Sequence, residues 1–442
     1  MTEQQVVLLA LVVIAVALLA YWARGLRGHQ RRLEQLAVRV HVNGIRGKST
    51  VTRLVAAVLR EGGYVTVAKT TGSAARVISP SGAESQIRRR GAPTIFEQVD
   101  VVEEHVNKDV EALVLECMAV RPLYQQYAED HMVRSDITII TNVRMDHQEE
   151  MGETLEEIAD SMSLTIPRGG VLITAEERPD LRERLRRNAA SRSSELVYAN
   201  PENVAADELL SFGHLEFREN VAIGLEVARL MGVSRDVAMR GMQKAVPDIG
   251  AVHLRHYQVG SKRVLWVPLF AVNDQESVNL AFDLLEPHFG EASAVIAIAN
   301  NRADRGRRAE LFARIFALDL ADRVDHVITF GAYEPQVTDL MIGHGLPAER
   351  ITNLGDTVRP SLEQILATVE TLIPGDLGVL VGMVNIHTQQ AEMLIEHFER
   401  LRGAAATDEI DLSRDPARLP KGAARLRRAR AHVRRPPANR DA

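Results

Sequence analysis

The stretch VRVHVNGIRGKSTVTRLVAAVLREGG, residues 38–63, indicates the fold class of this chain and its first candidate site. A strand-like run at 38–42 leads into the glycine-rich turn NGIRGKST. Apolar residues spaced three and four apart then predict a helix over 49–60, which Gly62 and Gly63 end. A strand, a glycine-rich turn and a helix in this order are the setting in which backbone amides bind phosphate.

The turn also carries the side chains that a nucleotide site needs. Lys48 would neutralise phosphate charge, and the hydroxyl that follows it would ligate Mg²⁺. The general phosphate-loop pattern requires a glycine five residues before Gly47, where this chain has Val42, so the turn has a shorter form. We predict ATP and Mg²⁺ as cofactors. The predicted nucleotide-binding residues of the turn are Asn43, Gly44, Arg46, Gly47, Lys48, Ser49 and Thr50, with Ser49 also at the metal.

Strand-like runs alternate with helical patterns along most of the chain. The first set lies at 38–42, 64–68, 112–116, 136–141 and 170–174, and the second at 263–270, 293–300, 326–331 and 377–383. Such alternation is typical of parallel, doubly wound α/β sheets. We predict a central ATP-binding domain at 37–247 and a smaller C-terminal α/β domain at 248–402.

Residues 6–22 read VVLLALVVIAVALLAYW, 17 residues without a charge, which is near the minimum length for a membrane span. Arginines follow closely at 24, 27, 31 and 32, so the positive-inside rule places the remaining chain in the cytoplasm. A cleaved signal peptide would have its positive charge before the apolar run. We therefore predict a single-pass transmembrane anchor and connector at 1–36, with a buried helix as the alternative.

Composition excludes several classes of protein. The 442 residues include one cysteine, Cys117, which excludes an intramolecular disulfide and a cysteine-based zinc cluster. Residues 416–442 hold nine Lys or Arg and one acid, so the net charge of −6 leaves −14 on the rest of the chain. An acidic body argues against nucleic acid as a partner. We predict a disordered basic tail at 403–442, which could bind lipid headgroups, a polyanionic product or neither.

Two further segments end strands with groups that suit a metal site. Glu116 closes the run 112–116, and Asp146 and His147 follow the run 136–141. Side chains at the carboxyl ends of parallel strands face the ligand crevice. Because Mg²⁺ prefers oxygen ligands, we predict that Glu116 binds it.

The short turn G-x-x-G-K-[ST]-T resembles the Mur ligase superfamily, which includes the peptidoglycan amino-acid ligases and folylpolyglutamate synthetase. Later segments, in order, are similar to the membrane-bound ligase family of poly-γ-glutamate synthesis, PgsB/CapB. The similar segments are KTTGSAARVISPSGAE (69–84), RRRGAPTIFEQ (88–98), LECMAVRP (115–122), TNVRMDHQEEMG (141–152), NDQES (273–277) and NNRADRGRR (300–308). The resemblance covers roughly residues 20–400.

This resemblance implies an ATP-dependent amide ligase that works through an acyl phosphate and polymerises glutamate into a growing poly-γ-glutamate chain. It implies catalytic roles for Lys48, Glu116 and His147, with His147 at a second Mg²⁺. It also implies nucleotide contacts from the C-terminal region, at Asn273, Asp274, Arg302 and Asp304. The implied partners are other membrane subunits of polymer synthesis and export, PgsC/CapC-like and PgsA/CapA-like. Whether the chain is a homo-oligomer stays open.

One departure from the superfamily and one set of arginines complete the prediction. Many members carry a carbamylated lysine on the helix after the Asp-His motif, but residues 155–164 contain none, so we transfer no bicarbonate dependence. Because arginine matches carboxylates bidentately, four arginines are candidates for holding glutamate or its polymer. They are Arg76, Arg88, Arg89 and Arg121. Two alternatives remain: another Mur-type ligase, acting on a peptidoglycan precursor or folate, and a non-catalytic nucleotide-switch subunit of an export complex.

Overall fold

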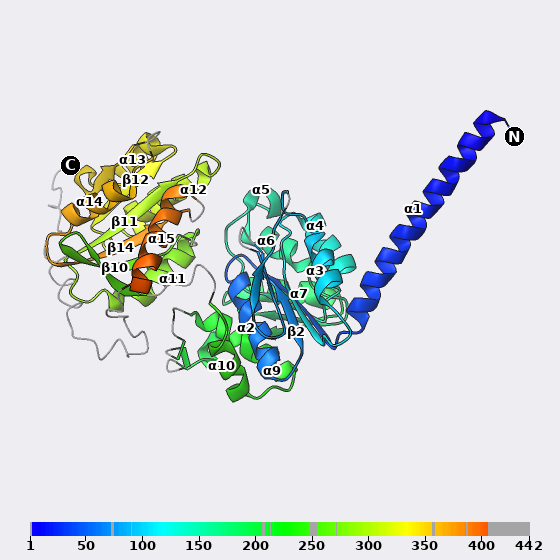
Figure 1. The fold of residues 1–442 in the computed structure, drawn as a ribbon. Helices are drawn as coiled ribbons and strands as arrows, with labels where there is room; N and C mark the ends of the chain where they lie inside the picture. The colour runs from blue at the N-terminus through cyan, green and yellow to red at the C-terminus, as the bar shows by residue number, and fades with distance from the viewer. Residues whose placement is uncertain are drawn as a thin grey trace, which may run out of the picture. The chain divides into compact units, whose positions relative to one another are not determined.

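The computed structural model describes residues 2–71, 75–89, 91–205, 208–209, 211–212, 214, 216–247, 254–270, 272–355, 359–385 and 388–404. Two compact units can be distinguished, Met1–Leu209 with Glu216–Asp248 and Leu210–Leu215 with Ile249–Ala442. Each unit has its own β-sheet and is described by itself (Figure 1). The predicted tail lies outside the described residues from position 405 onward.

The sheet of the first unit contains eight strands in the order β4-β3-β2-β5-β1-β6-β7-β8. All neighbours from β2 to β8 pair in parallel, which confirms the predicted α/β class. Strands β3 and β4 instead form an antiparallel hairpin at the edge, so the sheet is mixed. These two strands have three residues each, too few to show a period. The bounds are β1 Val38–Asn43, β2 Thr66–Lys69, β3 Arg76–Ile78, β4 Glu84–Gln86, β5 Ala112–Glu116, β6 Ile137–Ile140, β7 Val171–Thr174 and β8 Glu195–Tyr198.

Helices cover both faces of this sheet (Figure 1). Helix α2 buries an apolar stripe that includes Val51, Leu54 and Val58, and it packs against α9 and α10. Helix α3 and the π-helical turn η1 share an apolar cluster with β2 and β5, whereas α6 and α7 form another. The bounds are α2 Lys48–Glu61, α3 Glu97–His105, α4 Pro122–Tyr127, η1 Ala128–Val133, α5 Gln148–Met151, α6 Leu155–Ser163, α7 Pro179–Ser191, η2 Pro201–Asn203, α9 Arg218–Leu230 and α10 Arg235–Gln243.

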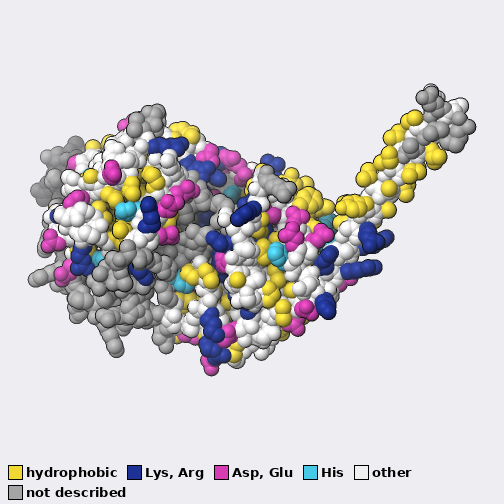
Figure 2. Space-filling model, in the orientation of Figure 1, with side chains coloured by type: hydrophobic (Ala, Val, Ile, Leu, Met, Phe, Trp, Pro, Cys, Tyr) yellow, Lys and Arg dark blue, Asp and Glu magenta, His cyan; other side chains and the backbone are white. Residues whose placement is uncertain are grey.

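The N-terminal helix α1 (Glu3–Glu34) runs without a break from the apolar segment to the first unit. Within the described residues, one helix, over Val7–Glu34, has the length and hydropathy of a membrane span, and its apolar window is not buried. Figure 2 shows apolar side chains along the projecting part of α1 and Lys and Arg side chains near its base. The base is attached to the unit, because Leu33 is buried and the His29 ring lies 2.8 Å from the carbonyl oxygen of Met132.

The second unit contains a six-stranded sheet in the order β13-β12-β11-β14-β10-β9, parallel except for the β9–β10 pair. One apolar cluster lies between the sheet and α11, α12 and α13, and a second lies between the sheet and α14 and α15. The bounds are β9 Arg255–Val259, β10 Lys262–Pro268, α11 Gln275–Leu285, β11 Ala294–Asn301, α12 Gly306–Arg314, β12 His326–Gly331, α13 Glu334–Gly343, β13 Ile351–Asn353, α14 Leu362–Leu372, β14 Leu377–Met383 and α15 Gln389–Ala404.

Candidate functional site

The turn between β1 and α2, the predicted phosphate loop, is close-packed. Gly44 and Gly47 have φ values of +128° and +80°, which side-chain-bearing residues rarely adopt. A Cβ atom at Gly44 would overlap the Thr141 hydroxyl, and one at Gly47 would lie 2.7 Å from Oδ1 of Asn220. The loop therefore requires glycine at both positions, both for conformation and for space.

Two positively charged side chains of the loop, Lys48 and Arg46, have hydrogen-bond partners in the loop itself and in the segment after β6. The Lys48 ammonium donates to the carbonyl oxygens of Gly44, at 2.7 Å, and Ile45, at 3.3 Å. Burial lowers the pKa of Lys48, although Glu116 opposes this effect. The Arg46 guanidinium donates to Asp146 at 2.7 Å. The ammonium thus lies over the loop, where phosphate oxygens would meet it.

Ser49, Thr71 and Glu116 form a cluster of oxygen atoms beside the loop, which we call the oxygen clasp. The Ser49 hydroxyl donates to both carboxylate oxygens of Glu116, at 2.9 and 3.1 Å. The Thr71 backbone N–H and hydroxyl donate to the same carboxylate at 2.8 and 2.7 Å. Because β2, β5 and β1 are neighbours in the sheet, the residues at their carboxyl ends meet.

The composition of the clasp fits a divalent cation. A carboxylate and two hydroxyls are hard oxygen ligands of the kind that Mg²⁺ and Mn²⁺ accept together with phosphate oxygens. Glu116 is 3% exposed and carries the negative charge that would balance the ion. Ser49, Thr71 and Glu116 are therefore the residues that would hold a cation next to the phosphate loop.

Asp146 and His147 lie near the loop, and the His147 backbone N–H donates to the Asp146 carboxylate at 2.9 Å. The His147 Nε2 atom is 3.9 Å from the Asp146 carboxylate, and the residue has a φ of +54° at the start of α5. Burial lowers the pKa of His147; Asp146 opposes this effect, and Lys48 adds to it. The neutral imidazole that results is the form that ligates metals.

Three residues of the site are not among those predicted from the sequence. Thr71 follows β2, Gln98 donates from Nε2 to the Glu116 carbonyl oxygen at 2.8 Å, and Asn220 of α9 lies against Gly47. Thr71 lies inside the quoted segment KTTGSAARVISPSGAE, which is the signal that would have found it. Gln98 likewise ends the quoted segment RRRGAPTIFEQ, whereas Asn220 becomes visible only through tertiary contact.

Asn43 was predicted at the nucleotide, and the structure places its side chain beneath the loop. Its amide donates to Gln125 at 2.9 Å and to Thr165 at 3.2 Å, and its Oδ1 accepts from the Gly44 N–H at 2.8 Å. Asn43 is also buried. These contacts describe a residue that shapes the loop from below. Thr50 lies in the first turn of α2 and is half-buried.

The four arginines predicted to bind substrate have different surroundings. Arg89 holds the Glu97 carboxylate through two nitrogens, at 2.5 and 3.1 Å, and Arg76 lies 3.5 Å from Glu84. Both therefore already have a carboxylate of this chain as a partner. Arg88 and Arg121 are exposed.

The predicted nucleotide contacts of the C-terminal region lie in the second unit. Asp274 is the N-cap of α11 and accepts from the Ser277 N–H at 2.9 Å, immediately after Asn273. Arg302 and Asp304 follow β11 and pair with each other at 2.7 and 2.9 Å. Local contacts thus engage Asp274, Arg302 and Asp304, and the nucleotide role of all four residues remains a prediction.

Helix α6 has no lysine at the position where a carbamylated lysine would lie. The candidate positions are Ser161, Met162 and Ser163, all of them buried. Met162 belongs to the apolar cluster of α6 and α7, and Ser161 accepts from Gln125 at 3.1 Å. The helix therefore offers packing and hydroxyl groups at these positions.

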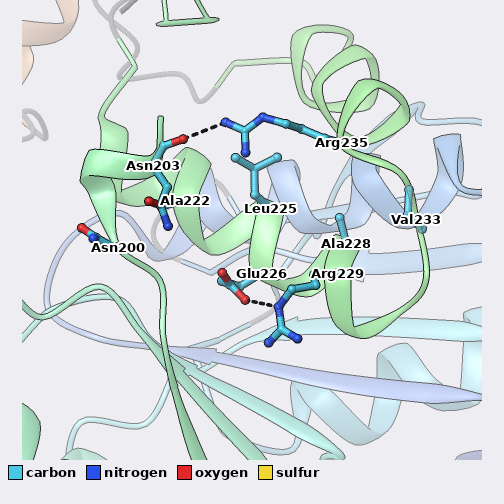
Figure 3. A pocket seen from close by; sticks show the side chains of 9 residues that line it. All are labelled: Asn200, Asn203, Ala222, Leu225, Glu226, Ala228, Arg229, Val233 and Arg235. Atoms are coloured by element: carbon cyan, nitrogen blue, oxygen red, sulfur yellow. Dashed lines mark hydrogen bonds and ion pairs between the residues drawn. The ribbon is translucent and has the colours of Figure 1, made fainter. Parts of the chain in front are cut away.

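A cavity of about 270 Å³ lies elsewhere in the first unit, between η2 and the helices α9 and α10 (Figure 3). Its floor includes Leu225 and Val233, and at its rim Arg229 contacts Glu226 while Arg235 contacts the Asn203 carbonyl oxygen. Neither the loop nor the clasp lines this cavity.

Comparison with known proteins identifies the family of this chain. Residues 42–213 match the Mur ligase middle domain, and residues 254–401 match the poly-gamma-glutamate synthase CapB C-terminal domain. The chain is 33% identical over 395 residues to the capsule biosynthesis protein CapB of Bacillus anthracis, across 89% of this chain and 82% of that protein. It is 34% identical over 378 residues to the PGA synthase CapB of Bacillus subtilis (strain 168), across 85% and 94% of the two chains.

Solved structures share the fold at lower identity. MurF from Acinetobacter baumannii superposes with a TM-score of 0.59 at 18% identity, over 83% of this chain and 78% of its own. E. coli FolC in complex with ADP superposes with a TM-score of 0.57 at 14% identity, over 86% and 93%. The chain therefore belongs to the poly-γ-glutamate synthase CapB family, whose members are ATP-dependent amino-acid ligases of the Mur type.

Proposed function

We propose that this chain is a membrane-anchored ligase that uses ATP to polymerise glutamate, through its γ-carboxylate, into poly-γ-glutamate. The observation that carries the proposal is the meeting of phosphate loop and oxygen clasp at the ends of neighbouring strands, in a chain of the CapB family. The relative named PGA synthase CapB supports the polymer. The related fold solved with ADP supports the nucleotide.

The proposed reaction has two steps. A carboxylate oxygen of glutamate attacks the γ-phosphorus of ATP, and the bond from that phosphorus to the bridging oxygen breaks. The products of this step are ADP and a glutamyl acyl phosphate. The amine of a second glutamate unit then attacks the acyl carbon. The tetrahedral intermediate expels phosphate, the nitrogen gives up a proton to solvent, and an amide remains.

The protein contributes position and charge to these steps. The amides of the loop and the Lys48 ammonium would bind the transferring phosphoryl group, and the Arg46–Asp146 pair would keep the loop in its conformation. A divalent cation, when bound, supplies positive charge to the phosphates, with Ser49, Thr71 and Glu116 as its ligands. Neutral His147, which lies near the phosphate loop, would be available to bind a second ion.

Arg88 and Arg121 are the proposed contacts to substrate carboxylates. Both are exposed, whereas Arg76 and Arg89 already lie against Glu84 and Glu97. A guanidinium matches a carboxylate with two parallel hydrogen bonds, so each arginine could hold one carboxylate of a polyanionic chain.

Helix α1 is the proposed anchor, with the ligase units in the cytoplasm, where ATP is available. Its large apolar side chains from Val7 to Trp22 are exposed, and arginines follow on the side of the first unit. An anchored polymerase would deliver its product at the membrane. Partner subunits that synthesise or export the polymer in the membrane therefore fit this arrangement.

Membranes that contain the chain, supplied with ATP, Mg²⁺ and labelled L- or D-glutamate, test the proposal. We expect ADP and labelled polymer to form together, and neither to form with the Lys48→Ala variant. ADP release without amide formation would overturn the ligase assignment and favour a nucleotide switch. Polymer formation by the Lys48→Ala variant would overturn the role of the loop.

A further inference from the structure

Lys69 is a buried charged residue that the proposed function does not use. It is the last residue of β2 and is fully buried, with its ammonium 3.0 Å from Oε1 of Glu97 and 3.5 Å from the sulfur of Met118. Glu97 is the first residue of α3 and also accepts from Arg89. Burying an ammonium costs several kcal/mol unless a carboxylate compensates it, so Lys69 and Glu97 require each other.

Lys69 and Glu97 each lie one or two residues before a residue that contacts Glu116. Two residues after Lys69, Thr71 holds the Glu116 carboxylate through its N–H and its hydroxyl. One residue after Glu97, Gln98 donates to the Glu116 carbonyl oxygen at 2.8 Å. The ion pair therefore links the end of β2 to the start of α3, and both segments contact Glu116.

A contribution to stability alone does not account for this placement. Buried ion pairs replaced by well-packed apolar residues often leave stability unchanged or increased, so such a pair is weak support for a purely structural role. Residues behind metal ligands, in contrast, orient the ligands and commonly change metal affinity when they are removed.

We propose that Lys69 and Glu97 are positioning residues that hold Thr71 and Glu116 in the geometry of the oxygen clasp, so that a divalent cation meets preformed ligands. This inference rests on the proposed function, because it assumes that the clasp binds the cation of the nucleotide.

The direction in which the Mn²⁺ affinity changes in a Lys69 variant separates the possible roles of Lys69. If Lys69 positions the clasp, Lys69→Met weakens Mn²⁺ binding by about 10- to 100-fold. If Lys69 acts only as a positive charge near the site, its removal tightens Mn²⁺ binding, because like charges repel. If Lys69 acts only in stability, the melting temperature changes and the Mn²⁺ affinity does not.

The experiment measures Mn²⁺ binding by electron paramagnetic resonance, with AMPPNP present, to the full chain in lipid nanodiscs. Arg39→Met is the matched control, because Arg39 pairs with Asp136 at 2.6 Å near the opposite end of β1 from the phosphate loop. Lys69→Gln also removes the positive charge and carries the test if Lys69→Met does not fold. We expect both Lys69 variants, and not the control, to weaken Mn²⁺ binding.

Unchanged or tighter Mn²⁺ binding in a folded Lys69→Met or Lys69→Gln variant would overturn the inference while the proposed function stands. Absence of Mn²⁺ and AMPPNP binding by the unmodified chain would overturn the proposed function and the inference with it. Weaker binding in the Arg39→Met control to the same extent would also overturn the inference, because any ion pair would then have the same effect.

Discussion

Glu116→Gln is the substitution that tests the oxygen clasp most directly. The change keeps the volume of a side chain that is 3% exposed, but it removes the negative charge of the clasp. One acceptor oxygen also becomes an NH₂ group, so either the Thr71 N–H, which donates to Oε2, or the Thr71 hydroxyl, which donates to Oε1, faces a donor. The variant therefore loses charge and one hydrogen bond at the same place.

The size of the effect on metal binding follows from Coulomb's law. A unit charge about 2.1 Å from a doubly charged cation contributes about 4 kcal/mol, even at the dielectric constant of water. The amide oxygen retains part of this through its dipole, so we expect a net loss of about 2–3 kcal/mol. That loss corresponds to roughly a 30- to 150-fold weaker affinity. The lost hydrogen bond would lower the stability of the fold by about 1–3 kcal/mol.

The assay is a Mg²⁺ titration of glutamate-dependent ADP release, paired with a thermal melt of the same sample. Glu176→Gln is the matched control, since Glu176 is also 3% exposed and accepts from the Val143 N–H at 2.8 Å close to the end of β7. Both variants should melt at lower temperature, but only Glu116→Gln should require more Mg²⁺. A Mg²⁺ midpoint within about twofold of the unmodified chain would refute the assignment of Glu116 as a ligand.

Four further predictions concern the loop lysine, a buried histidine, the topology of the chain and its basic tail. Lys48→Ala should abolish ATP turnover and leave the melting temperature almost unchanged, because the ammonium contacts only carbonyls of its own loop; a folded variant with normal turnover would contradict this. Burial opposes protonation of His41, yet Cys117 and Glu129 raise the pKa of His41 to about 10. This folded-state pKa exceeds the ordinary 6.5, so the free energy of unfolding should fall between about pH 6.5 and 10, and a Glu129→Gln variant with the same pH dependence of melting would argue against the pairing. Protease added outside intact cells should leave the chain after residue 22 uncut, and deletion of residues 403–442 should change lipid association, polymer length or neither, according to what the tail binds.

The local sequence was enough to predict the phosphate loop and the position of Glu116. The loop is a contiguous strand, turn and helix, so glycine spacing and apolar period identify it without tertiary information. Glu116 ends a run of buried aliphatic residues, and the carboxyl end of a parallel strand faces the ligand crevice wherever that strand lies in the sheet. The α/β class followed from the same alternation of strands and helices, and the short edge hairpin β3–β4 was missed because three-residue strands show no period.

Only the tertiary structure decided which side chains meet at the site. Strand β2 pairs with β5, and this pairing brings Thr71 to Glu116, 45 positions later in the chain. The same packing pairs Arg89 and Lys69 with Glu97, so one predicted substrate arginine already has a partner and a buried lysine lies next to the clasp. Strand order and long-range ion pairs depend on how complete elements pack together, and the free energy of that packing is spread over both sheets and their helices. A local motif carries the chemistry of its own residues, whereas the geometry between motifs is a property of the fold.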